Sequence, residues 1–82
     1  MTRKPKNSDR AARALTALSV YTAEMFDNNN PEQMQRTDLQ CALCDIIADL
    51  LHLANQHALN VYDVVRLACD HFEAELAEEA QP

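Results

Sequence analysis

Residues 41–52, CALCDIIADLLH, contain several side chains that could take part in chemistry. Cys41 and Cys44 are separated by two residues, a spacing that occurs in redox-active dithiols and in zinc sites. A redox pair commonly lies at the start of a helix that follows a strand, whereas this sequence predicts no strand here. The neighbouring carboxylates of Asp38 and Asp45 also disfavour a thiolate. The sequence therefore gives no support to a redox site.

A zinc site at the same place needs two further protein ligands. Cys69 and His71 could supply them only if a later helix faced this turn. Cys44 also lies among apolar residues at helical spacing, where a free cysteine behaves as a small hydrophobic side chain. We interpret Cys41 and Cys44 as structural residues.

Acidic and histidine side chains follow the cysteines at helical spacing. Asp45, Asp49 and His52 lie at positions i, i+4 and i+7 and so share one helix face, and His71 and Glu75 share a face further along. If the two faces met, they could form a metal site of the kind that helical bundles build. An ordinary solvated face has the same pattern, and we prefer that interpretation. We therefore expect no catalytic residues, no metal and no cofactor.

The elements that position these residues are expected to be helices. The 82-residue chain has 48% hydrophobic residues and no glycine, whereas strand-rich folds depend on glycine in their many tight turns. Apolar residues recur at helical spacing in three segments, which predicts an all-α domain with helices at about residues 8–26, 31–57 and 61–79. Residues 1–7 are expected to form a flexible basic tail, and residues 8–82 a single helical domain.

The predicted boundaries rest on capping residues. Asn30 before Pro31 fits the start of the central helix, and Asn60 fits the start of the third. Thr37 offers a second possible start, so residues 31–57 form either one helix or a short turn followed by a helix.

The central helix carries two adjacent apolar stripes, although a surface helix needs only one. The first stripe comprises Leu39, Leu43, Ile46, Leu50 and Leu53. The second stripe comprises Cys44, Ile47, Leu51, Ala54 and Ala58. Because so short a chain buries little surface by itself, we expect the second stripe to form the interface of a homodimer.

Charge is distributed unevenly along the sequence. The net charge is −6, yet five of the seven basic residues are Arg3, Lys4, Lys6, Arg10 and Arg13. The rest of the chain would repel a phosphate backbone, so nucleic-acid binding is not expected. The third segment instead offers an acidic face to a protein partner with a basic surface. This face comprises Asp63, Asp70, Glu73, Glu75 and Glu78.

Localisation is predicted from what the sequence lacks. No apolar run approaches the roughly 18 residues of a membrane span, and the charged start of the chain precedes no apolar signal region. The odd number of three cysteines has no disulfide-framework spacing, so reduced thiols are expected. We therefore expect a cytoplasmic protein that does not bind membranes.

The stretch from residue 45 to residue 60, DIIADLLHLANQHALN, resembles part of the MazG-like nucleotide pyrophosphohydrolases. In that family an aspartate begins a long apolar helix. A leucine–alanine pair, a histidine-rich or basic turn, a glycine, an aliphatic residue and an aspartate follow. The corresponding places are occupied here by Asp45, Leu53, Ala54, Leu59 and Asn60. The resemblance implies an all-α, oligomeric, magnesium-dependent hydrolase.

The sequence departs from the family at the metal ligands. The family uses Glu-x-x-Glu on one helix and Glu-x-x-Asp on the next, but Ala42 stands three residues before Asp45 and the first helix offers only Glu24. The resemblance therefore implies a degenerate relative that keeps the helical assembly. A hydrolase that uses Asp45, Asp49, His52 and Glu75 is the alternative.

Together these patterns favour a non-catalytic, acidic helical interaction module. Small acidic helical proteins of this kind occur among phage and mobile-element accessory factors, some of which inhibit a partner by occupying its basic surface. The alternatives are the metal-dependent hydrolase, active or degenerate, and a small DNA-binding regulator that uses the basic N-terminal arm.

Overall fold

The computed structural model describes residues 4–25 and 30–80. These residues form α1 (Asn7–Met25), the 3₁₀ helix η1 (Pro31–Gln33), α2 (Arg36–Gln56) and α3 (Val61–Ala80). No strand occurs among the described residues. The prediction of a small all-α domain with three helices is confirmed.

The predicted central helix divides into two elements, which answers the question that the capping signals left open. Asn30 does act as a cap, since its side chain accepts a hydrogen bond from the backbone N–H of Glu32 at 3.0 Å, but the turn that it starts ends at Gln33. Met34 and Gln35 are extended, and α2 starts at Arg36 without a side-chain cap. Of the two predicted alternatives, the structure has the short turn followed by a helix, because extended backbone at Met34 and Gln35 separates η1 from α2.

The turn between α2 and α3 is closed by backbone hydrogen bonds. The N–H of Leu59 donates to the carbonyl of Ala54 and the N–H of Ala58 to that of Asn55, both at 3.0 Å, which is the Schellman arrangement. Ala58 has a φ of 60°, a left-handed conformation that glycine normally occupies. Asn60 then caps α3, as predicted. Its side-chain oxygen accepts hydrogen bonds from the backbone N–H groups of Tyr62 at 3.0 Å and Asp63 at 3.1 Å.

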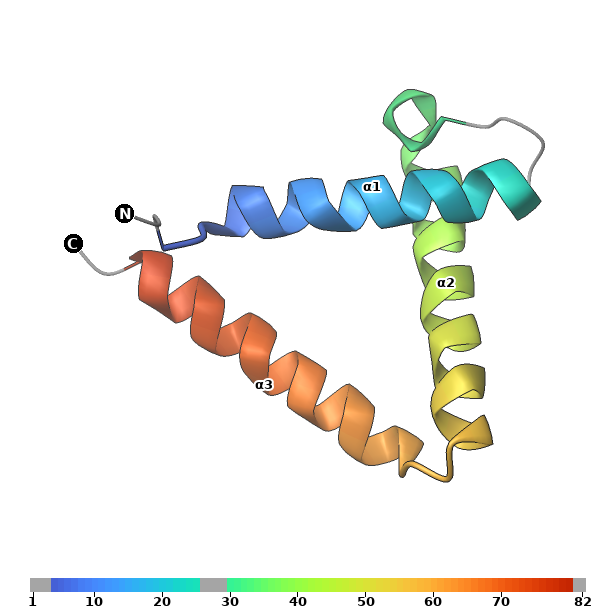
Figure 1. The fold of residues 1–82 in the computed structure, drawn as a ribbon. Helices are drawn as coiled ribbons and strands as arrows, with labels where there is room; N and C mark the ends of the chain where they lie inside the picture. Colours follow the sequence, from blue (N-terminus) through green and yellow to red (C-terminus); the bar gives the residue numbers. More distant parts are fainter. Residues whose placement is uncertain (1–3, 26–29, 81–82) are drawn as a thin grey trace.

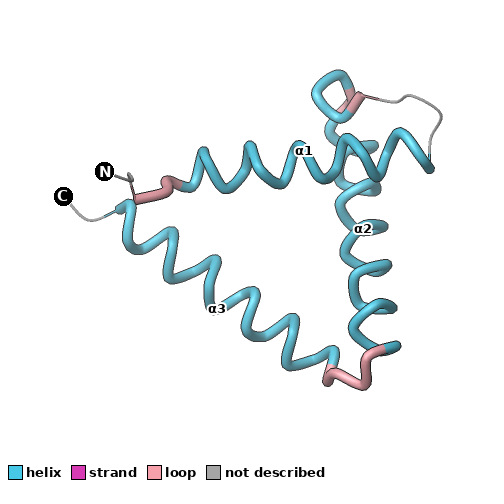
Figure 2. The backbone as a smooth tube through the Cα atoms, viewed as in Figure 1, coloured by secondary structure: helices cyan, strands magenta, loops and turns pink. Residues whose placement is uncertain are grey.

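The three helices form an open triangle (Figures 1 and 2). α1 crosses α2 near the start of α2, and α3 runs from the end of α2 back to the start of α1. The chain measures 42 × 35 × 28 Å along its principal axes. Its radius of gyration is 14.7 Å, whereas a compact domain of this length has roughly 12 Å. The helices therefore meet at their ends more than along their lengths.

Burial is concentrated where α1, η1 and α2 meet. Leu18 and Thr22 of α1, Pro31 of η1 and Ala42 of α2 are buried, and Ala54 is buried near the turn to α3. No residue of α3 is buried. The third segment has apolar residues at helical spacing, yet Phe72 is 61% exposed. This exposure fits the arrangement of the helices, in which α3 approaches its neighbours near its two ends (Figure 1).

Candidate functional site

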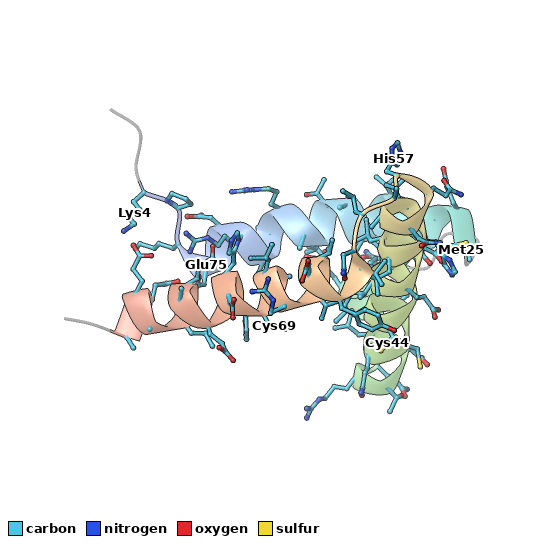
Figure 3. All side chains as sticks on the ribbon, turned by 90° about the horizontal axis from the view of Figure 1, so that it is seen from below. Lys4, Met25, Cys44, His57, Cys69 and Glu75 are labelled. Carbon is cyan, nitrogen blue, oxygen red and sulfur yellow. The ribbon has the colours of Figure 1, made fainter. Side chains whose placement is uncertain are left out.

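Polar side chains join the start of α1 to the end of α3. We call this group the clasp, and Figure 3 shows two of its members, Lys4 and Glu75, on the same side of the molecule. The clasp comprises Lys4, Asn7, Arg10, Glu75, Glu78 and Glu79.

Four contacts in the clasp join a donor near the start of α1 to an acceptor near the end of α3, and a fifth supports them within α1. Arg10 Nε lies 2.9 Å from Glu75 Oε2, and these two side chains are 25% and 34% exposed. The side chain of Asn7 donates to the backbone carbonyl of Glu75 at 3.1 Å and accepts from Arg10 Nη1 at 2.7 Å. Lys4 pairs with Glu78, and the backbone N–H of Asn7 donates to Glu79.

The clasp is also favourable for the two helix dipoles. A helix N-terminus carries partial positive charge and a C-terminus partial negative charge. The Glu79 carboxylate accepts the N–H of the first residue of α1, while Lys4 and Arg10 lie beside the last turns of α3. The pairing therefore neutralises charges at both helix ends.

The clasp changes the interpretation of the predicted acidic face. Two of its five residues, Glu75 and Glu78, bind cations of the same chain. Asp63 and Asp70 lie 3.5 and 3.7 Å from Arg66, and all three side chains are about 60% exposed, so solvent screens these pairs. Glu73 forms no ion pair within the described part of the chain. The acidic surface that remains available comprises Asp63, Asp70 and Glu73.

A second polar contact joins α1 to α2. The hydroxyl of Tyr21 donates to Asp49 Oδ2 at 2.6 Å. This hydrogen bond, with desolvation and the negative charges of Asp49 and Asp45, raises the pKa of Tyr21 from 10.0 to about 12. Asp49 is thus engaged in holding two helices together. The sequence pattern did not reveal this role, because nothing local connects Tyr21 to α2.

The five residues of the possible metal cluster are not brought together. Across residues 4–25 and 30–80, no three His, Cys, Asp or Glu side chains are placed to hold a metal ion. Asp49 is bound to Tyr21, and Glu75 belongs to the clasp. The three cysteines Cys41, Cys44 and Cys69 are free and exposed.

The predicted dimer stripe is only partly available to a second copy. Ile47 is 52% exposed, and Cys44 and Ala58 are exposed as well. Leu51 is half-buried, and Ala54 is buried within its own chain. Ala54 therefore offers almost no surface to another molecule.

Fold and site together define an all-α protein in which several charged groups, among them Arg10, Asp49 and Glu75, join one helix to another. A scan against protein-family models matches no family, and comparisons with curated proteins and with solved structures find no match. These comparisons leave the resemblance to MazG-like enzymes without support or contradiction. Among the described helices, none is both long enough and apolar enough to cross a membrane.

Proposed function

We propose that the protein is a non-catalytic helical module that binds a protein partner with a basic surface. The observation that carries this proposal is the outer side of α3, where Asp63, Asp70 and Glu73 are exposed and only Arg66 offsets them. A surface of one sign attracts an oppositely charged partner and speeds the encounter. The net charge of −6 acts in the same direction.

The two alternatives have less support. A magnesium-dependent hydrolase needs several converging carboxylates, whereas Asp45 is exposed and Asp49 is bound to Tyr21. A DNA-binding regulator needs a free basic arm, but Lys4 and Arg10 pair with carboxylates of α3. The proposal extends to a setting among phage or mobile-element accessory proteins, by analogy of fold and charge.

A charge-reversal experiment tests the proposed surface. The tagged protein is used to capture partners from its native host, in parallel with an Asp70→Lys, Glu73→Lys variant. The control is a Glu24→Lys, Glu32→Lys variant, which makes the same change in net charge at exposed positions outside α3. We expect the control to capture the same partner as the unmodified protein, and the α3 variant to lose most of it.

Two measurements decide between this proposal and its alternatives. The association rate with the captured partner should fall as salt rises, and the α3 variant should be slower than the control at low salt. Equal capture by both variants would exclude the acidic surface of α3 from the function. Turnover of a nucleoside triphosphate that disappears in an Asp45→Ala variant would make the protein an enzyme.

A further inference from the structure

We infer that a second copy of this chain covers two apolar stripes that the single chain leaves open. We call them the open stripes. They comprise Leu43, Ile47 and Leu50 on α2 and Val65, Phe72 and Leu76 on α3. These six side chains are between 41% and 61% exposed, although each sequence segment has the periodicity of a buried helix face.

The exposed area of the chain is large enough for a second copy to cover part of it. The chain exposes 6998 Å². A compact monomer of 9.2 kDa exposes roughly 4,900 Å², so this chain has an excess of about 2,000 Å². Two copies that each lost this excess would bury about 4,000 Å² in total, which lies in the range of obligate homodimers. The excess exposed area of the chain, to which the open stripes contribute, is therefore large enough for a permanent interface.

The small core of the single chain argues for a second copy as the occupant. Among the described residues, the buried hydrophobic side chains other than proline are Leu18, Ala42 and Ala54. So few buried groups do little to offset the entropy that is lost when the chain is ordered. A partner that buries the open stripes is therefore needed whenever the chain is folded. A second copy is the one partner that is made in equal amount with every chain, and closed two-fold dimers are the commonest assemblies.

Charge also distinguishes this surface from the acidic surface of α3. The open stripes contain no charged residue, so two chains of net charge −6 can bring these stripes together without burying a carboxylate within them. Asp63, Asp70 and Glu73 lie on a different side of the same helix by its 3.6-residue period. The inference therefore stands apart from the proposed partner binding, and either one can fail alone.

Sedimentation equilibrium of the full chain tests the inference with three lysine substitutions. Ile47→Lys and Phe72→Lys each place a charge in an open stripe, and Val20→Lys is the control at an apolar residue of α1 that is 63% exposed. All three positions are exposed in the single chain, so a chain that remains single should tolerate each lysine similarly. We expect about twice the mass of the 9.2 kDa chain for the unmodified protein and the control. Dimerisation should be weaker by about 100-fold in the two stripe variants, because a buried unpaired charge is costly.

Thermal unfolding of the unmodified protein keeps the test decisive if a stripe variant fails to fold. The unfolding midpoint of a dimer rises with protein concentration, whereas that of a monomer does not. A rising midpoint together with unfolded or monomeric stripe variants supports the inference. A monomeric mass with a constant midpoint overturns it, as does a dimer that persists unchanged in both stripe variants.

Discussion

The two ends of α1 are attached to the rest of the chain by different kinds of contact. Near its C-terminal end, Leu18 and Thr22 are buried where α1 meets η1 and α2. At its N-terminal end, Arg10 and Asn7 bind α3 through ion pairs and hydrogen bonds at partly exposed positions. Buried apolar groups are protected from salt and pH, whereas exposed ion pairs contribute little and are screened.

The comparison shows which helix contacts of the single chain are stabilised by buried side chains. The corner between α1 and α2 has a small core of its own. The corner between α3 and α1 is joined by the ion pairs and hydrogen bonds of the clasp, and no residue of α3 is buried. The single chain therefore secures α3 through polar contacts more than through burial.

Substitution in the core of the first corner should have the largest effect. We expect Leu18→Ala to lower the free energy of unfolding by about 2–4 kcal/mol, because the side chain is buried and its loss leaves a cavity. Val20→Ala on the same helix should change it by less than about 0.5 kcal/mol, since this side chain is mostly exposed. Urea unfolding followed by circular dichroism measures both. Equal losses in the two variants would contradict the placement of the core.

Glycine at the corner between α2 and α3 should stabilise the protein. Ala58 has positive φ, which costs an L-residue about 1 kcal/mol, so Ala58→Gly should raise the free energy of unfolding by up to that amount. The control is the same substitution at Ala48, an exposed position inside α2. There it should lower the stability by about 1 kcal/mol. The same urea titration checks that the two changes have opposite signs.

The clasp should contribute less to the free energy of unfolding than the core around Leu18 or the turn at Ala58. We expect Glu75→Gln to reduce the free energy of unfolding by about 0.5–1 kcal/mol at low salt, and by less at high salt. Asp70→Asn breaks the more exposed 3.7 Å pair with Arg66 and should cost close to nothing. A loss for Glu75→Gln that does not change with salt would show that the clasp does not act through charge.

The contact between Tyr21 and Asp49 should affect how the folding stability and the ionisation of Tyr21 depend on pH. A phenol whose pKa is raised in the folded state favours folding below its ordinary pKa of 10, and this contribution is lost as the pH rises through about 12. Ultraviolet absorbance of the phenolate, measured in a Tyr62→Phe background, should therefore show Tyr21 titrating near 12. Asp49→Asn should lower that pKa towards 10. A titration that Asp49→Asn leaves unchanged would exclude the contact as the cause.

Local rules in the sequence predict much of this fold. The three helices follow from apolar periodicity, and Asn30 and Asn60 act as caps because a cap depends only on the next few residues. The break near Met34 is one of two alternatives that the capping signals leave open, because the residues around it are compatible with a helix as well. The left-handed conformation of Ala58 could not be predicted, since glycine is its usual sequence signal.

Contacts between distant residues could not be predicted in the same way. The clasp joins residues 65 to 74 positions apart, and its only signal in the sequence is a basic start and an acidic end. That signal was interpreted as a free tail and a partner surface. Amphipathic periodicity shows that α3 has a face to bury, but it does not say whether the same chain or another one covers it.

The triangular arrangement of the helices has a consequence for the order of folding. The α2–α3 turn forms between neighbours in sequence, and the corner of α1 and α2 joins adjacent elements. The clasp instead closes a loop of almost the whole chain, and long-range closure is entropically more costly and slower. The clasp should therefore be the last contact made when the chain folds. It should also be the first lost in local opening, so the backbone amides at the start of α1 should exchange with solvent before those near Thr22.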